Sequence, residues 1–133
     1  MNAKQVTEER HIDLAAHARS PAQARTFVRE TLKDWGYMEV EPEVSLAVTE
    51  LVTNALVHAD SPSSLSLSDL EGSVRIVVHD NEPQLPHVVH AEDGDTHGRG
   101  LAMIDALATC WGVEMDERGK IVWLDISDGP GKH

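Results

Sequence analysis

Two polar residues four positions apart, Glu50 and Asn54, are the first candidates for chemistry in this sequence. On a helix that turns about 100° per residue, both side chains project from one side and flank an apolar stripe. A carboxylate and an amide both offer oxygen atoms, so this pair could hold a hard cation and orient a hydroxyl group. Taken alone, the spacing favours a simpler interpretation, in which the two residues form a solvated helix flank with a local hydrogen bond.

Two further segments contain residue types that contact ligands. Asp80 ends a β-branched run and could accept a hydrogen bond from a ligand amine, although by itself it favours a turn. The segment Gly98-Arg99-Gly100-Leu101 precedes an apolar-periodic run, where glycines allow close backbone approach and the N–H groups of a helix start favour phosphate. Arg99 would add a charged donor. A lone Gly-x-Gly before a helix is about as often a simple loop-to-helix transition as a phosphate-binding segment.

The elements that must position these residues follow from periodicity and turn residues. A helix is predicted from near Pro42 to about Ala59, and a hairpin of strands 65–69 and 74–79 follows around a Glu71-Gly72 turn. Before these, a strand is predicted at 10–16, followed by a helix that has Ser20 as N-cap and Pro21 at its first position and that stops at Gly36. After them, the sequence predicts a loop at 81–97, a helix at 101–109, and a hairpin of strands 111–115 and 121–126. This order predicts an α+β fold with helices on one face of a largely antiparallel sheet.

Composition narrows the classes of function. The chain has 133 residues, with 11 Lys and Arg against 23 Asp and Glu, which gives a formal net charge of −12. Such a charge argues against sequence-independent binding to nucleic acid or acidic lipid, because that binding needs clustered Lys and Arg residues. The single cysteine, Cys110, excludes an intrachain disulfide, and no apolar run approaches the ~20 residues of a membrane span. We therefore expect one soluble, cytoplasmic domain that contacts neither nucleic acid nor membrane.

The three candidate segments, taken together and in this order, resemble a known family. Residues 50–59, Glu-Leu-Val-Thr-Asn-Ala-Leu-Val-His-Ala, look like the N box of the Bergerat-fold (GHKL, histidine-kinase-like) ATPases, in particular the small anti-sigma-factor serine kinases. Asp80 with its proline-containing loop looks like the G1 box, and Gly98-Arg99-Gly100-Leu101 looks like the G2 box. The resemblance extends from about Val40 to Ile126. It implies a two-layer α/β sandwich with a mostly antiparallel mixed sheet and helices packed on one face.

The resemblance implies a role for each matching residue. Asn54 would coordinate Mg²⁺ between the phosphates of ATP, and Asp80 would accept a hydrogen bond from the adenine amino group. Glu50 would act as the general base that deprotonates a serine hydroxyl for in-line attack on the γ-phosphate. Glutamate at this position, where sensor histidine kinases usually have asparagine, favours transfer to a hydroxyl.

The glycine-rich segment and its surroundings would complete the nucleotide site. Gly98, Gly100 and Leu101 would let the loop and helix start close over the phosphates, with Arg99 as a phosphate contact. His58, one turn after Asn54, would either contact the nucleotide or interact with the helix C-terminus.

The resemblance also implies the organisation and role of the whole chain. It predicts a single ATPase domain over residues 1–133, with an ordered core at about 9–126 and an ATP lid at 82–97. The implied function is a regulatory serine/threonine protein kinase that sequesters a sigma factor and phosphorylates a serine on an anti-anti-sigma (STAS-type) antagonist, with a homodimer as one possible state. The alternative is a non-catalytic ATP-binding or degenerate Bergerat module that regulates by protein sequestration. It is motivated by Glu82, where the family usually has glycine, and by the lack of a glycine cluster before Gly98.

Overall fold

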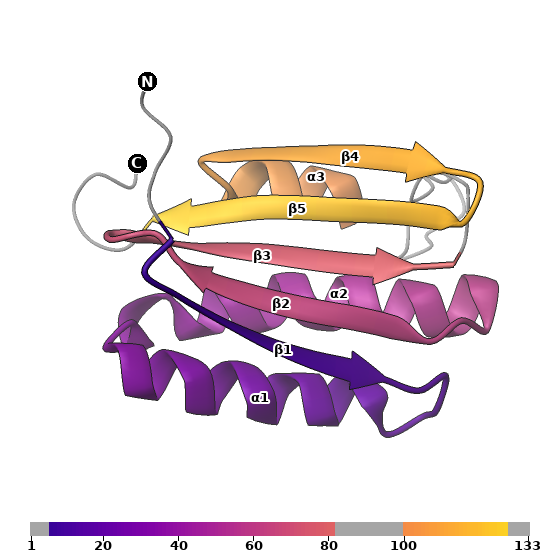
Figure 1. The fold of residues 1–133 in the computed structure, drawn as a ribbon, viewed down its shortest axis with the longest axis horizontal. Helices are drawn as coiled ribbons and strands as arrows, with labels where there is room; N and C mark the ends of the chain where they lie inside the picture. Colours follow the sequence, from indigo (N-terminus) through magenta and orange to yellow (C-terminus); the bar gives the residue numbers. More distant parts are fainter. Residues whose placement is uncertain (1–5, 82–99, 128–133) are drawn as a thin grey trace.

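The computed structural model describes residues 6–81 and 100–127 (Figure 1). The elements, in chain order, are β1 (Glu8–Leu14), α1 (Ser20–Trp35), the 3₁₀ turn η1 (Met38–Val40), α2 (Glu41–Ala59), β2 (Ser63–Asp69), β3 (Ser73–Asp80), α3 (Gly100–Leu107), β4 (Cys110–Asp116) and β5 (Gly119–Ser127). Each helix and strand expected from periodicity is present, with bounds shifted by up to two residues. The loop expected at 81–97 lies, apart from its first residue, outside the described residues.

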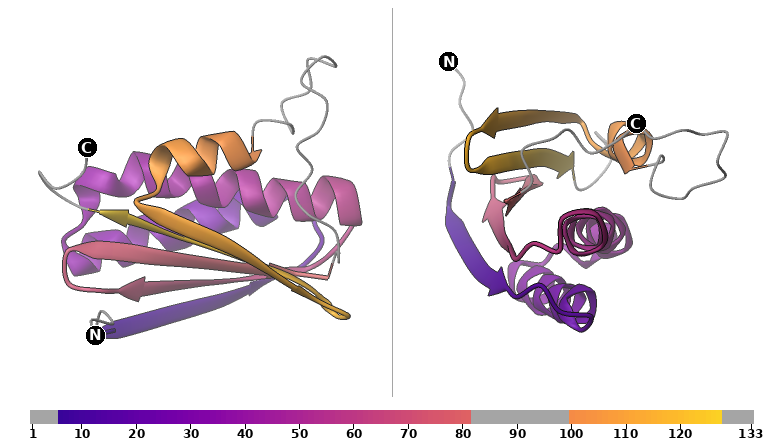
Figure 2. Two further views of the ribbon diagram at one scale, coloured as in Figure 1. Left: turned by 90° about the horizontal axis from the view of Figure 1, so that it is seen from above. Right: turned by 90° about the vertical axis from the view of Figure 1, so that its right-hand side faces the viewer.

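The strands form one sheet in the order β1-β2-β3-β5-β4, and every pairing is antiparallel. The expectation of a mixed sheet is therefore wrong for the described strands. β5 is inserted between β3 and β4, so the last strand of the chain occupies an inner position of the sheet. The helices cover one face of the sheet, which confirms the expected two-layer arrangement (Figure 2).

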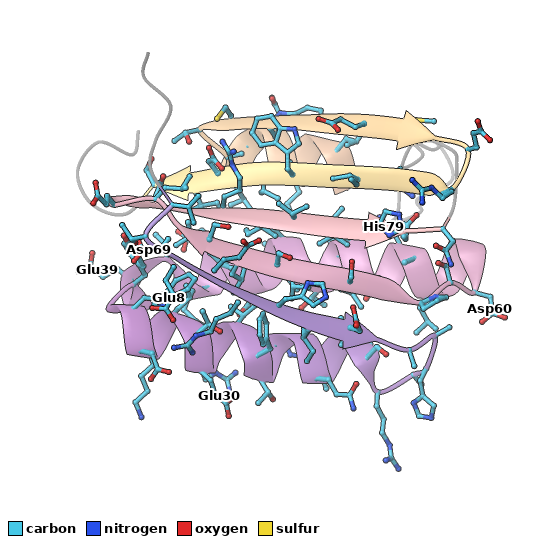
Figure 3. The ribbon with its side chains drawn as sticks, in the orientation of Figure 1. Glu8, Glu30, Glu39, Asp60, Asp69 and His79 are labelled. Atoms are coloured by element: carbon cyan, nitrogen blue, oxygen red, sulfur yellow. The ribbon has the colours of Figure 1, made fainter. Side chains whose placement is uncertain are left out.

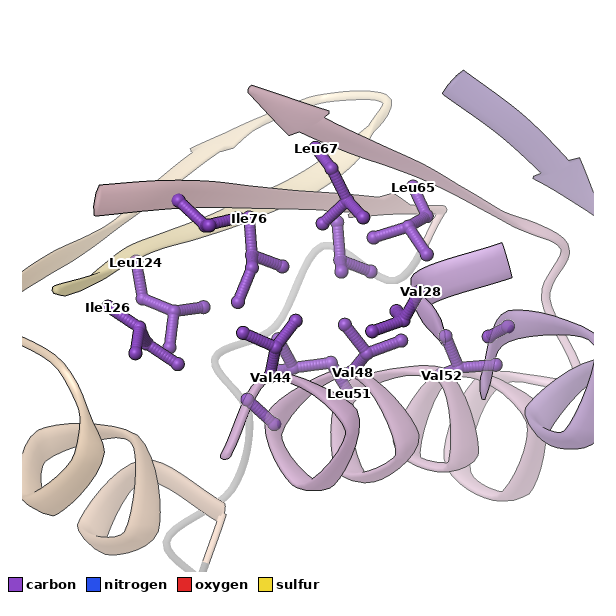
Figure 4. Packing of buried hydrophobic residues seen from close by; sticks show 14 of the residues in the cluster. Val28, Val44, Val48, Leu51, Val52, Leu65, Leu67, Ile76, Leu124 and Ile126 are labelled. Carbon is purple, nitrogen blue, oxygen red and sulfur yellow. The ribbon is translucent and has the colours of Figure 1, made fainter. Parts of the chain in front are cut away.

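The core lies between the helices and the sheet, with α2 at its centre, because strand alternation and helix periodicity direct apolar side chains to the same layer. From α2, the stripe of Val44, Val48, Leu51 and Val52 is buried. It packs beneath buried strand residues of β2, β3 and β5, which are Leu65, Leu67, Ile76, Leu124 and Ile126 (Figure 4). The opposite strand positions carry mostly polar residues and face away from the helices.

The ends of α1 show one correct and one incorrect prediction. Gly36 ends the helix with φ +83°, the left-handed conformation that a glycine stop predicts. Ser20 is not the N-cap, because Arg19 occupies that position and makes no side-chain capping bond. The Ser20 hydroxyl instead donates to the carbonyl of Ala15, so the serine closes the preceding turn.

None of the helices in residues 6–81 and 100–127 is long and apolar enough to cross a membrane.

Candidate functional site

The elements that carry the candidate residues meet at one end of the fold. The C-terminal end of α2, the last residues of β3 and the β4–β5 turn lie at the same end of the sheet (Figure 1). α3 runs alongside α2, and the two helices are in contact (Figure 2). The topology thus brings the regions around Asn54, Asp80 and Leu101 together, although they are far apart in the sequence.

Glu50 and Asn54 project from α2 at the edge of the core, as their spacing predicts. Asn54 is 9% exposed, whereas Glu50 is half-buried. In the part of the chain that the structure describes, no residue forms a hydrogen bond or ion pair with the Glu50 carboxylate. A carboxylate in this position can accept a proton from an incoming hydroxyl group without first breaking an internal bond.

The end of α2 is tied to the end of β3. Asp60 follows the helix with φ +48°, and the N–H groups of Asp60 and Ser61 donate to the carbonyls of Leu56 and Ala55, each at 3.1 Å. The Ser61 hydroxyl oxygen then accepts the backbone N–H of Asn81 at 2.9 Å. This bond fixes the point where the chain leaves β3, immediately after Asp80.

Asp80 is held by a residue that the sequence analysis did not identify. The ammonium of Lys120, on β5, donates to both carboxylate oxygens of Asp80, at 3.1 and 2.9 Å. The two side chains are 6% and 4% exposed, so this is a buried ion pair. It forms because Asp80 and Lys120 are directly opposite in the antiparallel register and share the face toward the helices.

A signal for Lys120 was present in the sequence. Lys120 lies two, four and six residues before Val122, Leu124 and Ile126, which are all buried. Strand alternation therefore places Lys120 on the core side, where an isolated cation is unfavourable and requires an acid partner. The identity of that partner depends on the register between β3 and β5, which local periodicity does not reveal.

Gly119 allows β3 and β5 to approach closely at this ion pair. Its φ is +143°, and a Cβ at this position would overlap the carbonyl oxygen of Asp80 and lie 2.8 Å from the Cα of Asn81. A side chain there would push the two strands apart. The geometry of the Asp80 carboxylate thus depends on Lys120, Ser61 and Gly119.

Other predicted site residues are only partly covered by the structure. Gly98 and Arg99 lie outside the described residues, as does the side chain of His58, and for Gly100 the structure describes only its place at the start of α3. Leu101 is half-buried and packs against the core cluster. Within the described part of the chain, no group of three or more His, Cys, Asp and Glu residues is arranged to hold a metal ion.

A hollow of 570 Å³ lies at the same end of the sheet and is lined in part by Asp13, Ser64 and His79. His79 is on the sheet face away from the helices (Figure 3). Asp80, the next residue, points the opposite way, and neither Glu50 nor Asn54 lines the hollow. This hollow is therefore distinct from the predicted nucleotide site.

Comparison with protein families identifies one match over most of the chain. The family model described as a histidine kinase-like ATPase domain matches residues 14–126. An uncharacterized protein of Streptomyces coelicolor is 38% identical over 72 residues, which cover 50% of this chain and 69% of that protein.

Solved structures show the same fold. The RsbU and RsbW domains of Rv1364c from Mycobacterium tuberculosis match with a TM-score of 0.68 and 25% identity, over 92% of this chain. This chain spans only 33% of that larger protein chain. The histidine kinase domain of a blue-light activated histidine kinase from Erythrobacter litoralis matches with a TM-score of 0.50 and 27% identity, over 67% of this chain and 45% of that one.

Proposed function

This chain belongs to the histidine kinase-like ATPase family, and from that premise we propose that it is an ATP-dependent protein serine kinase of the anti-sigma-factor type. The family membership supports an ATP-binding, kinase-like module. The likeness to a structure that contains an RsbW domain supports a regulatory role based on the exchange of protein partners. In the proposed role, the protein sequesters a sigma factor and phosphorylates a serine on an anti-anti-sigma antagonist of the STAS type.

The observation that carries this proposal is the position of Glu50. Its half-buried carboxylate has no partner among the described residues and lies one turn before Asn54 on the same side of α2. In the proposed reaction, the carboxylate takes the proton of the substrate serine hydroxyl as the serine oxygen forms a bond to the γ-phosphorus. The bond between that phosphorus and the β–γ bridging oxygen breaks, and ADP leaves. Positioning and charge neutralisation dominate the rate of such a transfer.

The remaining candidate residues would hold the nucleotide. Asn54 offers an amide oxygen, a donor type that suits a hard cation such as Mg²⁺, which would neutralise phosphate charge when bound. Asp80 would accept the amino group of the base. His58, Gly98, Arg99, Gly100 and Leu101 would contact the phosphates or close over them, and residues 82–97 would form the lid.

The test separates transfer from binding. We expect Glu50→Gln to bind Mg-ATP with the wild-type affinity, measured by calorimetry, and to transfer phosphate to serine about 10²- to 10⁴-fold more slowly. The readout is incorporation of labelled γ-phosphate into purified STAS-domain proteins of the source cell. Glu30→Gln, an exposed acid on α1, is the matched control and should keep full activity. Undiminished transfer by Glu50→Gln would refute the role of Glu50.

One observation favours the second candidate, a non-catalytic module that regulates by sequestration. Asp80 is engaged by a buried Lys120, and Glu82 follows two residues later. If these residues exclude the base, titration with Mg-ATP and Mg-ADP will give no saturable heat, whereas the kinase proposal requires saturable binding of both.

A further inference from the structure

One side of α2 carries two exposed apolar residues that the proposed function does not use. Leu46 is 50% exposed and Val57 is 57% exposed. Single exposed apolar residues are common on protein surfaces, so exposure alone indicates nothing. These two differ because Glu50 lies between them on the same side of the helix. At 3.6 residues per turn, Leu46, Glu50, Thr53 and Val57 fall within about 60° of one another around the helix axis, and we call these four residues the α2 outer stripe.

The α2 outer stripe faces away from the core. It lies on the side of the helix opposite Val44 and Val48, which are fully buried toward the sheet. Among the described elements, α1 and α3 flank α2, and the side of α2 away from the sheet is left uncovered by them (Figure 2). A protein that reaches Glu50 from this side therefore meets Leu46 and Val57 as well.

We propose that Leu46 and Val57 are the apolar contacts through which the phosphoacceptor protein docks on α2 and brings its serine hydroxyl to Glu50. This inference rests on the proposed function, in which the Glu50 carboxylate takes the proton of that hydroxyl. The hydroxyl oxygen must come within about 3 Å of the carboxylate, so the protein that carries it must cover the neighbouring surface of the helix. Helix rise places Leu46 about 6 Å before Glu50 and Val57 about 10 Å after it. Contacts on both sides of the serine thus fix its position along α2.

The charge of the α2 outer stripe favours this partner over a second copy of the chain. A two-fold symmetric contact through the stripe would bring two Glu50 carboxylates into one interface. The stripe contains no Lys, Arg or His, so neither copy supplies a cation from it, and burial of unpaired carboxylates is unfavourable. A serine hydroxyl, by contrast, is a neutral group that donates a hydrogen bond to the carboxylate.

The test removes both apolar contacts and leaves Glu50 in place. Leu46→Ala/Val57→Ala should fold like the wild type, because both side chains are exposed and alanine is the best helix former. From the burial of two half-exposed side chains, we expect the KM for the phosphoacceptor protein to rise about 10- to 30-fold. The kcat and the dissociation constant for Mg-ATP should keep their wild-type values, because neither side chain takes part in the transfer.

The measurement is the rate at which labelled γ-phosphate enters each purified STAS-domain protein of the source cell, as a function of that protein's concentration. The control is Val6→Ala, which removes a valine that is 51% exposed and lies before β1, and it should leave the KM unchanged. Calorimetry gives the affinity for Mg-ATP, and urea unfolding establishes that each variant is folded.

The outcomes separate docking from catalysis. If the wild type transfers phosphate and the double variant keeps the wild-type KM, or loses kcat instead, the docking surface is refuted and the proposed function stands. An equal rise in KM for Val6→Ala would also overturn the docking surface. If the wild type phosphorylates none of the STAS-domain proteins, the kinase proposal fails, and calorimetric titration with the same proteins in the presence of Mg-ADP tests docking alone. Binding that is about 10- to 30-fold weaker in the double variant would then support the surface, and equal affinity or no binding would overturn it.

Discussion

Replacement of Gly119 by alanine tests whether the contact between β3 and β5 controls the stability of the site. A Cβ at this position would overlap the Asp80 carbonyl and lie 2.8 Å from Asn81 Cα, and the residue also has a positive φ. The backbone strain contributes about 1–3 kcal/mol and the steric overlap about 1–3 kcal/mol more. We therefore expect a loss of about 3 kcal/mol or more in the free energy of unfolding, a large fraction of the total for one domain.

Gly36→Ala is the matched control because it separates the two contributions. Gly36 also has a positive φ, +83°, but a Cβ there would meet nothing within 4 Å. Only the backbone strain applies, so the expected loss is about 1 kcal/mol.

Urea unfolding followed by tryptophan fluorescence measures both variants. With a slope of about 1–3 kcal/mol per molar urea, the midpoint of Gly119→Ala should fall by about 1–3 M, and that of Gly36→Ala by less than 1 M. Equal midpoints for the two variants would show that Gly119 is needed only for its backbone conformation, and the argument from close strand approach would fail.

Two further predictions concern buried and partly buried polar contacts. Lys120→Met leaves the Asp80 carboxylate buried without the Lys120 ammonium, so the free energy of unfolding should fall by about 3–5 kcal/mol. Adding Asp80→Asn should restore most of this loss. A double variant as unstable as the single variant would contradict the coupling between the two residues. Burial raises the pKa of Asp69, but hydrogen bonds from the Tyr37 hydroxyl and a backbone N–H outweigh it, so the pKa lies below its ordinary value. The stability contributed by the ionised carboxylate is therefore present above about pH 4 and lost as the pH falls through the lowered pKa. Tyr37→Phe, which also removes the acceptor for the Gly72 N–H, should lower the free energy of unfolding by about 1–2 kcal/mol at pH 7 and by less at pH 3. A difference in urea midpoint between the variant and the wild type that does not change with pH would refute the coupling to Asp69.

The elements of the fold could be predicted because their signals are local. Pro21 and Pro42 mark helix starts, and Gly36 marks a helix end. Glu71 and Gly72 form a turn in which both residues have positive φ. Each of these features depends on the conformational preference of one or two residues. The N-cap predicted at Ser20 also came from a local signal, but it was wrong because the Ser20 hydroxyl donates to the Ala15 carbonyl in the preceding turn instead.

The candidate site could be predicted only in part, because its partners are distant in the sequence. Helix periodicity was sufficient to place Glu50 and Asn54 on one side of α2. The partner of Asp80 is 40 residues away and became evident only from the β3–β5 register. The catalytic and nucleotide-binding roles of all the candidate residues, Gly98 and Arg99 included, remain predictions.

The inner position of β5 has a consequence for the order of events during synthesis. The ribosome completes β1, α1, α2, β2 and β3 before Lys120 emerges, so an early intermediate can pack α1 and α2 on a partial sheet while the edge of β3 is still unpaired. Asp80 lies on that edge and lacks its counter-charge until the last strand inserts. The nascent chain therefore completes the Asp80–Lys120 ion pair last, and translation arrested before β5 yields a partial sheet without that pair.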